Sequence, residues 1–176
     1  MPVAPANPIS KALYYLGLTL ADAAAFRTWV GAINQAEALA HIYEQALPDP
    51  AAGAAHTRSE LEGYRPFAII FVDAEEGFAF DRDAYGGAAD FAHRGALWIM
   101  LEQTVDTQLT AAESDRDWLN ALGGIINDME ELAGQAGYLD IASGTLVEYG
   151  RAPADWVAET GDFHFAMLRV EWGVSR

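Results

Sequence analysis

The chain has 176 residues, of which 52% are apolar, so a single domain can build its own core. Its formal net charge is −16 and it has only ten Lys and Arg residues, which excludes a broad basic surface for binding nucleic acid. The sequence contains no cysteine, which excludes disulfides, thiolate catalysis and zinc–thiolate sites and fits a cytosolic protein. The negative charge has two interpretations, solubility or a surface that must not adhere to DNA.

The first residues predict a flexible arm. The segment MPVAPANPI, residues 1–9, carries three prolines and has no basic region followed by an apolar run, so it is unlike a secretory signal. No window reaches the roughly 20 apolar residues of a membrane span, so no membrane partner is expected. Residues 10–176 are expected to form one domain, because no linker or internal repeat interrupts them.

Helical spacing predicts two helices before residue 48. Ser10 is the expected N-cap of the first helix, and its apolar stripe continues to Gly31. Asn34 and Glu37 have the spacing of an N-cap and its reciprocal partner. The second helix is therefore expected to begin at Asn34 and to end at Pro48.

Two stretches rich in Ala, Gly and acidic residues, 48–65 and 73–92, are predicted to be long loops. Connections of this length are uncommon in compact domains and are usually functional or disordered. Four strands are expected around them, at 65–73, 95–105, 144–151 and in the stretch after Gly161.

One further helix is expected after residue 110. Thr110 and Glu113 have the spacing of a capping box, with Ser114 as the alternative N-cap. Gly123 and Gly124 lie in the middle of this helix, where each glycine costs about 1 kcal/mol relative to alanine. A close packing contact at these glycines would account for that cost.

The element order α-α-β-β-α-β-β predicts an α+β domain, in which an antiparallel four-stranded sheet carries helices on one face. The strands at 95–105 and 163–172 are apolar on both faces for half their length and then polar on one face. Helices on one side cover only one of these faces, so a second apolar set needs another cover. Which face the helices take is open at this stage. The candidates for an interface with another protein are Trp98, Met100, Phe163, Phe165 and Met167. The alternative is that the long loops fold over this face within the monomer.

The sequence shows no catalytic motif, and no catalytic, cofactor-binding or metal-binding residue is expected. The four histidines lack the H-x-x-x-H spacing of a helical zinc site. Asp81 and Asp83 flank Arg82, but no glycine-punctuated series of cation ligands follows them. A hydrolase would require His93 or His164 to lie beside an acidic residue in a deep cleft, and no motif in the sequence predicts this arrangement. We therefore expect no enzyme.

Several segments in this order resemble the tail terminator and related tail-completion (minor tail) proteins of long-tailed bacteriophages and prophages. The segments are FRTWVGAINQAEALAHIYEQALP (26–48), RPFAIIF (65–71), GALWIMLE (95–102), LNALGGIINDMEELAGQAGYL (119–139) and FHFAMLRVEWGV (163–174). The resemblance implies a structural protein that forms a ring, typically hexameric, caps the tail tube and joins the tail to the head. It also implies assembly in the cytoplasm and a final place in the virion tail.

The same resemblance implies specific partners and a role for the charge. The partners would be other copies of the chain, the tail-tube protein and a head-completion protein, with no sequence-specific binding of nucleic acid. A negative lumen would repel the phosphates of passing DNA. The candidates for an acidic lumen or docking loop are Glu75, Glu76, Asp81, Asp83 and Asp90.

A different class of function is compatible with the same residues. In this alternative the chain is a small-molecule binding α+β domain, and Trp98, Phe163 and Phe165 line an apolar pocket.

Overall fold

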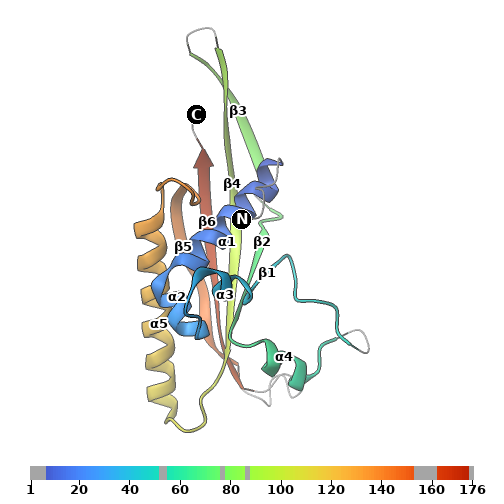
Figure 1. The fold of residues 1–176 in the computed structure, drawn as a ribbon, viewed down its shortest axis with the longest axis vertical. Coiled ribbons are helices and arrows are strands. Elements are labelled where there is room, and N and C mark those ends of the chain that lie inside the picture. The colour runs from blue at the N-terminus through green and yellow to red at the C-terminus, as the bar shows by residue number, and fades with distance from the viewer. Residues whose placement is uncertain (1–6, 52–54, 76–77, 86–87, 153–161, 175–176) are drawn as a thin grey trace.

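The computed structural model describes residues 7–51, 55–75, 78–85, 88–152 and 162–174. In chain order (Figure 1), the elements are α1 (Pro8–Asp22), α2 (Ala24–Val30), α3 (Gln35–Leu39), β1 (Ile42–Glu44), α4 (Arg58–Tyr64), β2 (Phe67–Val72), β3 (Phe78–Tyr85), β4 (Ala88–Thr104), α5 (Ala111–Leu132), β5 (Ile141–Ala152) and β6 (Phe163–Val174).

The strands form one sheet of six, in the order β1-β2-β4-β6-β5, with β3 paired to β4 beside this path. Every pair is antiparallel except β1 and β2, which run parallel. The α+β class is confirmed. The predicted four-stranded antiparallel sheet was wrong in strand number and in the orientation of one pair.

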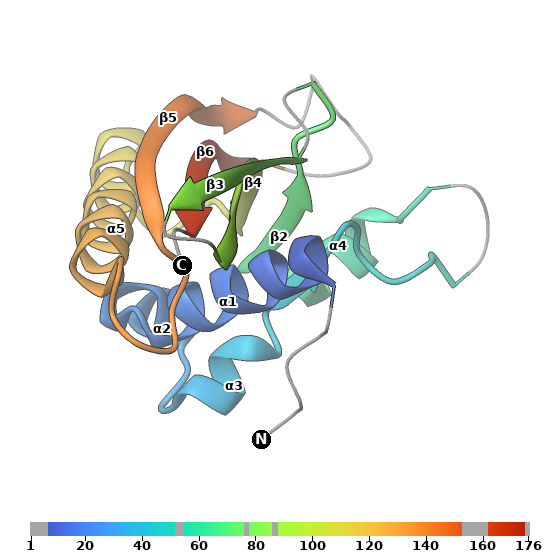
Figure 2. The ribbon, with the colours of Figure 1, turned by 90° about the horizontal axis from the view of Figure 1, so that it is seen from above.

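Three helices, α1, α2 and α5, lie along one side of the sheet (Figure 2), whereas α4 lies apart from this layer. The core lies between these helices and the alternating residues of β4 and β6 that point toward them. Its large, fully buried side chains include Leu16, Leu20, Phe26, Ile70, Leu97, Ile99, Leu101, Trp118, Leu122 and Ile125. Helices on one face, as the sequence predicted, therefore account for one apolar side of each central strand.

The first helix begins earlier than expected. Its N-cap is Asn7, whose side chain accepts hydrogen bonds from the backbone N–H groups of Ile9 (2.9 Å) and Ser10 (3.4 Å). Pro8 takes the first helical position, where its missing N–H costs nothing. Ser10 is thus inside the helix and not its cap. Of the predicted arm, residues 1–6 lie outside the described residues.

The second predicted helix is much shorter than expected. Asn34 caps it as predicted and accepts the Glu37 backbone N–H at 3.0 Å, but α3 ends at Leu39. The chain then forms β1, whose residues pair with β2 from Ala68 to Ile70. Apolar residues at positions 42 and 43 fit a strand as well as a helix, and the pairing partner lies about 26 residues further along the chain, beyond the reach of local periodicity.

The predicted loop 48–65 contains helix α4. Thr57 and Glu60 form a capping box, in which the Thr57 hydroxyl accepts the Glu60 backbone N–H and the Glu60 carboxylate accepts the Thr57 N–H at 2.7 Å. This pair has the T-x-x-E spacing of such boxes. The surrounding Ala, Gly and Pro residues indicate a loop, so the capping box was not recognised as the start of a helix.

The predicted loop 73–92 is mostly a β-hairpin. Strand β3 pairs with β4 from Phe78↔Gly95 to Tyr85↔Ala88, and this hairpin projects beyond the rest of the sheet (Figure 1). Consequently β4 begins at Ala88, seven residues before the predicted start at Gly95. Alternation in the hairpin is weak because Ala and Gly are frequent there, so periodicity did not reveal the strands.

Helix α5 begins as predicted. Thr110 is its N-cap, and Thr110 and Glu113 form the expected capping box. A Cβ atom added to Gly124 would lie 2.9 Å from the Cβ of Ala25 in α2, so this glycine permits a close helix–helix contact. A Cβ atom at Gly123 would meet nothing within 4 Å. The packing explanation holds for the second glycine of the pair and not for the first.

Candidate interaction surfaces

The sheet has an outer face, which we define as the side away from α1, α2 and α5. Directly opposed residues in antiparallel strands share a face. The register places them in rows across β2, β4 and β6: Phe71, Trp98 and Arg169; Ile69, Met100 and Met167; Phe67, Glu102 and Phe165; and, in the last two of these strands, Thr104 and Phe163. All five predicted interface residues therefore lie on the outer face.

The five predicted residues are half-buried. Their neighbours on β2 were not predicted as part of this surface: Phe71 is half-buried, and Phe67 and Ile69 are buried. The ring of Phe71 stacks on that of Trp98, with a centroid separation of 6.5 Å. The continuous apolar run 67–72 was the available signal, because a strand that is apolar at every position has an apolar side on each face.

The chain itself covers one end of the outer face. The Tyr43 ring contacts those of Tyr64 and Phe67, with centroid separations of 5.7 and 6.2 Å. The Arg65 guanidinium lies 4.4 Å from the centre of the Phe163 ring. Tyr43, Tyr64 and Arg65 thus cover the end of the outer face near Phe67 and Phe163, as expected if part of the chain folds back over this face.

A buried ion pair lies at this covered end. Arg65, whose side chain is 1% exposed, donates from Nη2 to Oε2 of Glu102 at 3.0 Å. Burial raises the pKa of Glu102, and the positive charge and hydrogen bonds of Arg65 oppose that rise. Two charges are therefore held together in a mainly apolar surface, and each depends on the other for compensation.

The other end of the outer face is polar and explains why β6 changes character along its length. Arg169 donates to Asp73, at the end of β2, at 3.0 Å and to Glu171 at 2.6 Å. The Ser143 hydroxyl donates to Glu171 at 2.9 Å. The hydrogen bond from Arg169, followed by that from Ser143, lowers the pKa of Glu171. The apolar part of the outer face is therefore bounded by this ion-paired cluster.

The predicted acidic candidates are only partly described. Glu75 is exposed, and its backbone N–H donates to Asp73 at 2.8 Å. Glu76 lies outside the described residues. The backbones of Asp81, Asp83 and Asp90 lie in the projecting hairpin, where Asp83 and Asp90 are paired across β3 and β4; their side chains are outside the described part. Within the described residues, no group of three or more His, Asp or Glu side chains is arranged to hold a metal ion.

His164 is buried in a polar chain between the sheet and the helices. Its Nε2 lies 2.9 Å from Oδ1 of Asp115, its Nδ1 lies 3.3 Å from Nε2 of Gln103, and its ring stacks on Trp118. This is an acid–histidine contact of the kind that would support a hydrolase. The imidazole is, however, 1% exposed, so no substrate reaches it without rearrangement.

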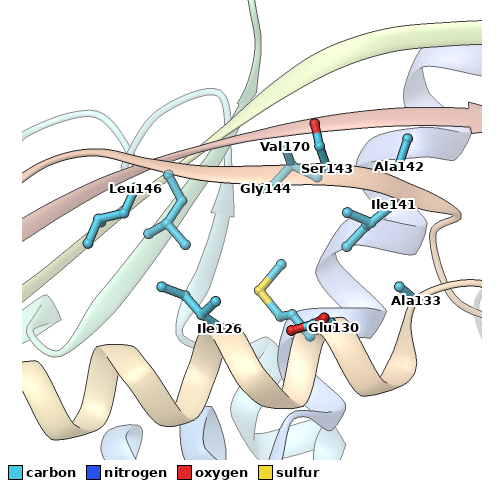
Figure 3. A pocket seen from close by; sticks show the side chains of 11 residues that line it. Ile126, Glu130, Ala133, Ile141, Ala142, Ser143, Gly144, Leu146 and Val170 are labelled. Carbon is cyan, nitrogen blue, oxygen red and sulfur yellow. The ribbon is translucent and has the colours of Figure 1, made fainter.

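Two hollows lie on the helix side of the sheet. One, of about 390 Å³, lies between α5 and β5 (Figure 3), and its apolar lining includes Ile126, Ile141, Leu146 and Val170. The other, of about 500 Å³, lies beside the start of α1 and is lined by polar and aromatic residues of the 135–140 loop. Neither is lined by Trp98, Phe163 or Phe165, where the small-molecule alternative placed its pocket.

No protein family model and no curated protein matches the chain. A solved structure described as "Virion of native gene transfer agent (GTA) particle" contains a chain similar to this one, with 11% identity and a TM-score of 0.39, covering 96% of this chain and 100% of that chain. At this identity and TM-score the likeness carries no functional argument. Among the described residues, no helix is long and apolar enough to cross a bilayer.

Proposed function

We propose that the protein is a structural component of a phage or prophage tail that self-associates into a ring, caps the tail tube and joins the tail to the head. The observation that supports this proposal best is the outer face of the sheet. Aromatic residues and Met predominate on it, a composition typical of interface cores. Among the described residues, Tyr43 and Arg65 cover the end of this face near Phe67 and Phe163.

The shape and charge of the chain fit the same role. The β3–β4 hairpin projects beyond the sheet, which suits an element that reaches a neighbouring subunit (Figure 1). The net charge of −16 suits a ring through which DNA passes, because a negative lumen repels phosphates. In this proposal Asp81, Asp83 and Asp90 of the hairpin and the neighbouring Glu75 and Glu76 contribute to the negative surface.

Charged substitutions on the outer face test the proposal. Trp98→Glu and Phe165→Glu are expected to abolish ring-sized particles in electron microscopy and light scattering, with or without tail-tube protein. The matched control is Thr104→Glu, because Thr104 belongs to the same face of β4 but is exposed and polar. Circular dichroism and thermal melting establish that each variant remains folded.

Two results would contradict this function. One is a wild-type protein that stays monomeric at high concentration and does not associate with tube subunits. The other is that both charged variants unfold, because the outer face would then be part of the core of the monomer.

A further inference from the structure

Strand β5 has an unpaired side within the part of the chain that the structure describes. It is at the end of the sheet and pairs only with β6. Register shifts between Ile141 and Ser143 and between Leu146 and Glu148 interrupt its pairing, which leaves two regular stretches, 143–146 and 148–152. An unpaired edge presents backbone N–H and C=O groups to which another extended chain can add.

An apolar slot runs along the same edge, between β5 and α5. Ile141, Gly144, Leu146 and Tyr149 face the helix side, because they are opposed to Trp172, Val170, Leu168 and Ala166, which lie on that side of β6. Across the gap, α5 presents Ile126 and its neighbours (Figure 3). The hollow of about 390 Å³ between them is large enough for several apolar side chains.

Exposed apolar side chains are concentrated on the two elements that flank this slot. Five large apolar side chains are exposed among the described residues, and three of them belong to these elements: Leu119 (47%) of α5, and Val147 (54%) and Tyr149 (53%) of β5. Leu119 is two helical turns from Ile126 and so lies on the same side of α5. Monomers rarely place an apolar hollow, exposed apolar residues and an unpaired strand edge together unless a partner binds there.

Two carboxylates lie at this edge of the sheet, one on each side of β5. Glu130 lines the hollow from α5, whereas Glu148 is exposed on the opposite face of β5, where it is opposed to Met167. Neither carboxylate forms an ion pair with a residue that the structure describes. A partner with positive side chains is therefore favoured at this edge, whereas a second copy of a chain with a net charge of −16 is disfavoured.

We infer that this edge binds an extended segment of another protein, in which apolar residues alternate with Lys or Arg. The segment adds to β5 as a new edge strand. Its apolar side chains enter the slot between Leu146 and Ile126. Its basic side chains point to the opposite side of the sheet, where Glu148 is opposed to Met167. The slot itself lies on the helix side, so the apolar contacts of this inference do not depend on the proposed function.

A defined peptide tests the inference on the full chain. The probe is a fluorescent, capped peptide of about eight residues, the length of an ordinary strand, with alternating Val and Lys. We expect saturable binding by fluorescence anisotropy, with shifts in the NMR amide signals of β5. A peptide with Glu in place of Lys should not bind. A peptide N-methylated along one edge should not bind either, because it lacks the donors that a strand requires.

Variants of the protein locate the site. A Cβ atom at Gly144 would meet nothing within 4 Å, so a side chain can begin there, and Gly144→Phe is expected to fill the slot. It is expected to weaken binding of the Val–Lys peptide at least about tenfold. The matched control, Thr145→Phe, places the same ring on the opposite face of the same strand and should leave the affinity unchanged. Glu130→Gln with Glu148→Gln changes charge without affecting packing, and should weaken binding and its salt dependence.

Each alternative gives a distinct result that overturns the inference. Peptide binding that is absent, or unaffected by Gly144→Phe and by the two Glu→Gln changes, rules out this edge as the site. Equal binding of the N-methylated peptide shows that the slot takes apolar groups without adding a strand. Wild-type dimers that form without peptide and are lost in Gly144→Phe show that the occupant is a second copy. Assembly of Gly144→Phe into rings is measured separately. If the rings still form, a loss of peptide binding concerns this edge alone and leaves the proposed function untouched.

Discussion

The Nε2 atom of the buried His164 ring lies 2.9 Å from Oδ1 of Asp115, a side chain that is 53% exposed. The other ring nitrogen faces the Gln103 amide, and Gln103 Oε1 accepts the Trp29 indole N–H at 2.5 Å. In this series of three hydrogen bonds, each donor faces an acceptor if Nε2 of His164 carries the imidazole proton. These four residues belong to α2, β4, α5 and β6, so the polar chain links the helical layer to the sheet.

His164→Leu should destabilise the protein by about 1–3 kcal/mol, because it leaves the Gln103 amide without its buried partner. The free energy of unfolding in urea measures the loss. Asp115→Ala is the comparison, and a smaller loss is expected because water can replace a half-exposed carboxylate. If the two variants lose equal stability, the hydrogen bond between Gln103 and His164 contributes nothing beyond the contact of His164 with Asp115.

The two glycines in the middle of α5 should respond in opposite directions to alanine. Gly124→Ala places a Cβ atom 2.9 Å from the Cβ of Ala25 and is expected to cost about 1–3 kcal/mol through overpacking. Gly123→Ala meets nothing within 4 Å and should stabilise the helix by up to about 1 kcal/mol. Thermal melting of the pair measures both effects. A stabilising Gly124→Ala would mean that α2 and α5 separate at no cost.

Arg65→Leu should increase the dependence of stability on pH. Burial holds the pKa of Glu102 above its ordinary value, so the folded state binds the proton more tightly and stability falls as pH rises through the interval above about 4.3. Without Arg65 nothing opposes the effect of burial, so that pKa rises further and the fall becomes larger and extends to higher pH. At neutral pH the variant should lose about 3 kcal/mol, because a buried carboxylate is left unpaired.

Unfolding curves across this pH interval, with an NMR titration of Glu102, measure both effects of Arg65→Leu. Arg151→Leu is the control, because it removes an arginine from a more exposed ion pair with Asp162 and should cost less than about 1 kcal/mol. An unchanged pH profile in Arg65→Leu would show that Glu102 reaches water once its partner is removed.

Thr110→Ala should remove a pH-dependent contribution from the start of α5. The hydrogen bonds that Thr110 donates from its hydroxyl and backbone lower the pKa of Glu113. The resulting stability is present above the ordinary pKa of a glutamate and is lost as pH falls through the lowered value. The free energy of unfolding of the variant should be lower by about 1 kcal/mol, because the helix loses its N-cap. It should also fall less steeply with decreasing pH in the acidic range.

Glu113→Gln separates the two effects of the capping box. It retains an acceptor for the Thr110 backbone N–H but no longer titrates, so the acid limb should flatten while the hydroxyl of Thr110 still caps the helix. Far-ultraviolet circular dichroism as a function of pH measures this. An acid limb that is as steep in Glu113→Gln as in the wild type would assign the pH dependence to another carboxylate.

The sequence by itself determined the features whose partners lie within a few residues. The caps at Asn34 and Thr110 were predictable, because an N-cap and its partner are three positions apart. Strands β2, β5 and β6 were predictable from short apolar or alternating runs. The alternation of β6 also predicted that Phe163, Phe165 and Met167 share a face, which the register confirms.

Only the tertiary structure decided the rest, because the stabilising partners are distant in the sequence. Residues 42–44 fit a helix by spacing, yet they form a strand because β2 offers backbone partners at 68–70. The weakly patterned stretches 78–85 and 88–95 form antiparallel strands because their backbone groups pair with one another. Which side of the sheet the helices cover, and how much of the other side Arg65 and Tyr43 cover, depend on packing that no local pattern encodes.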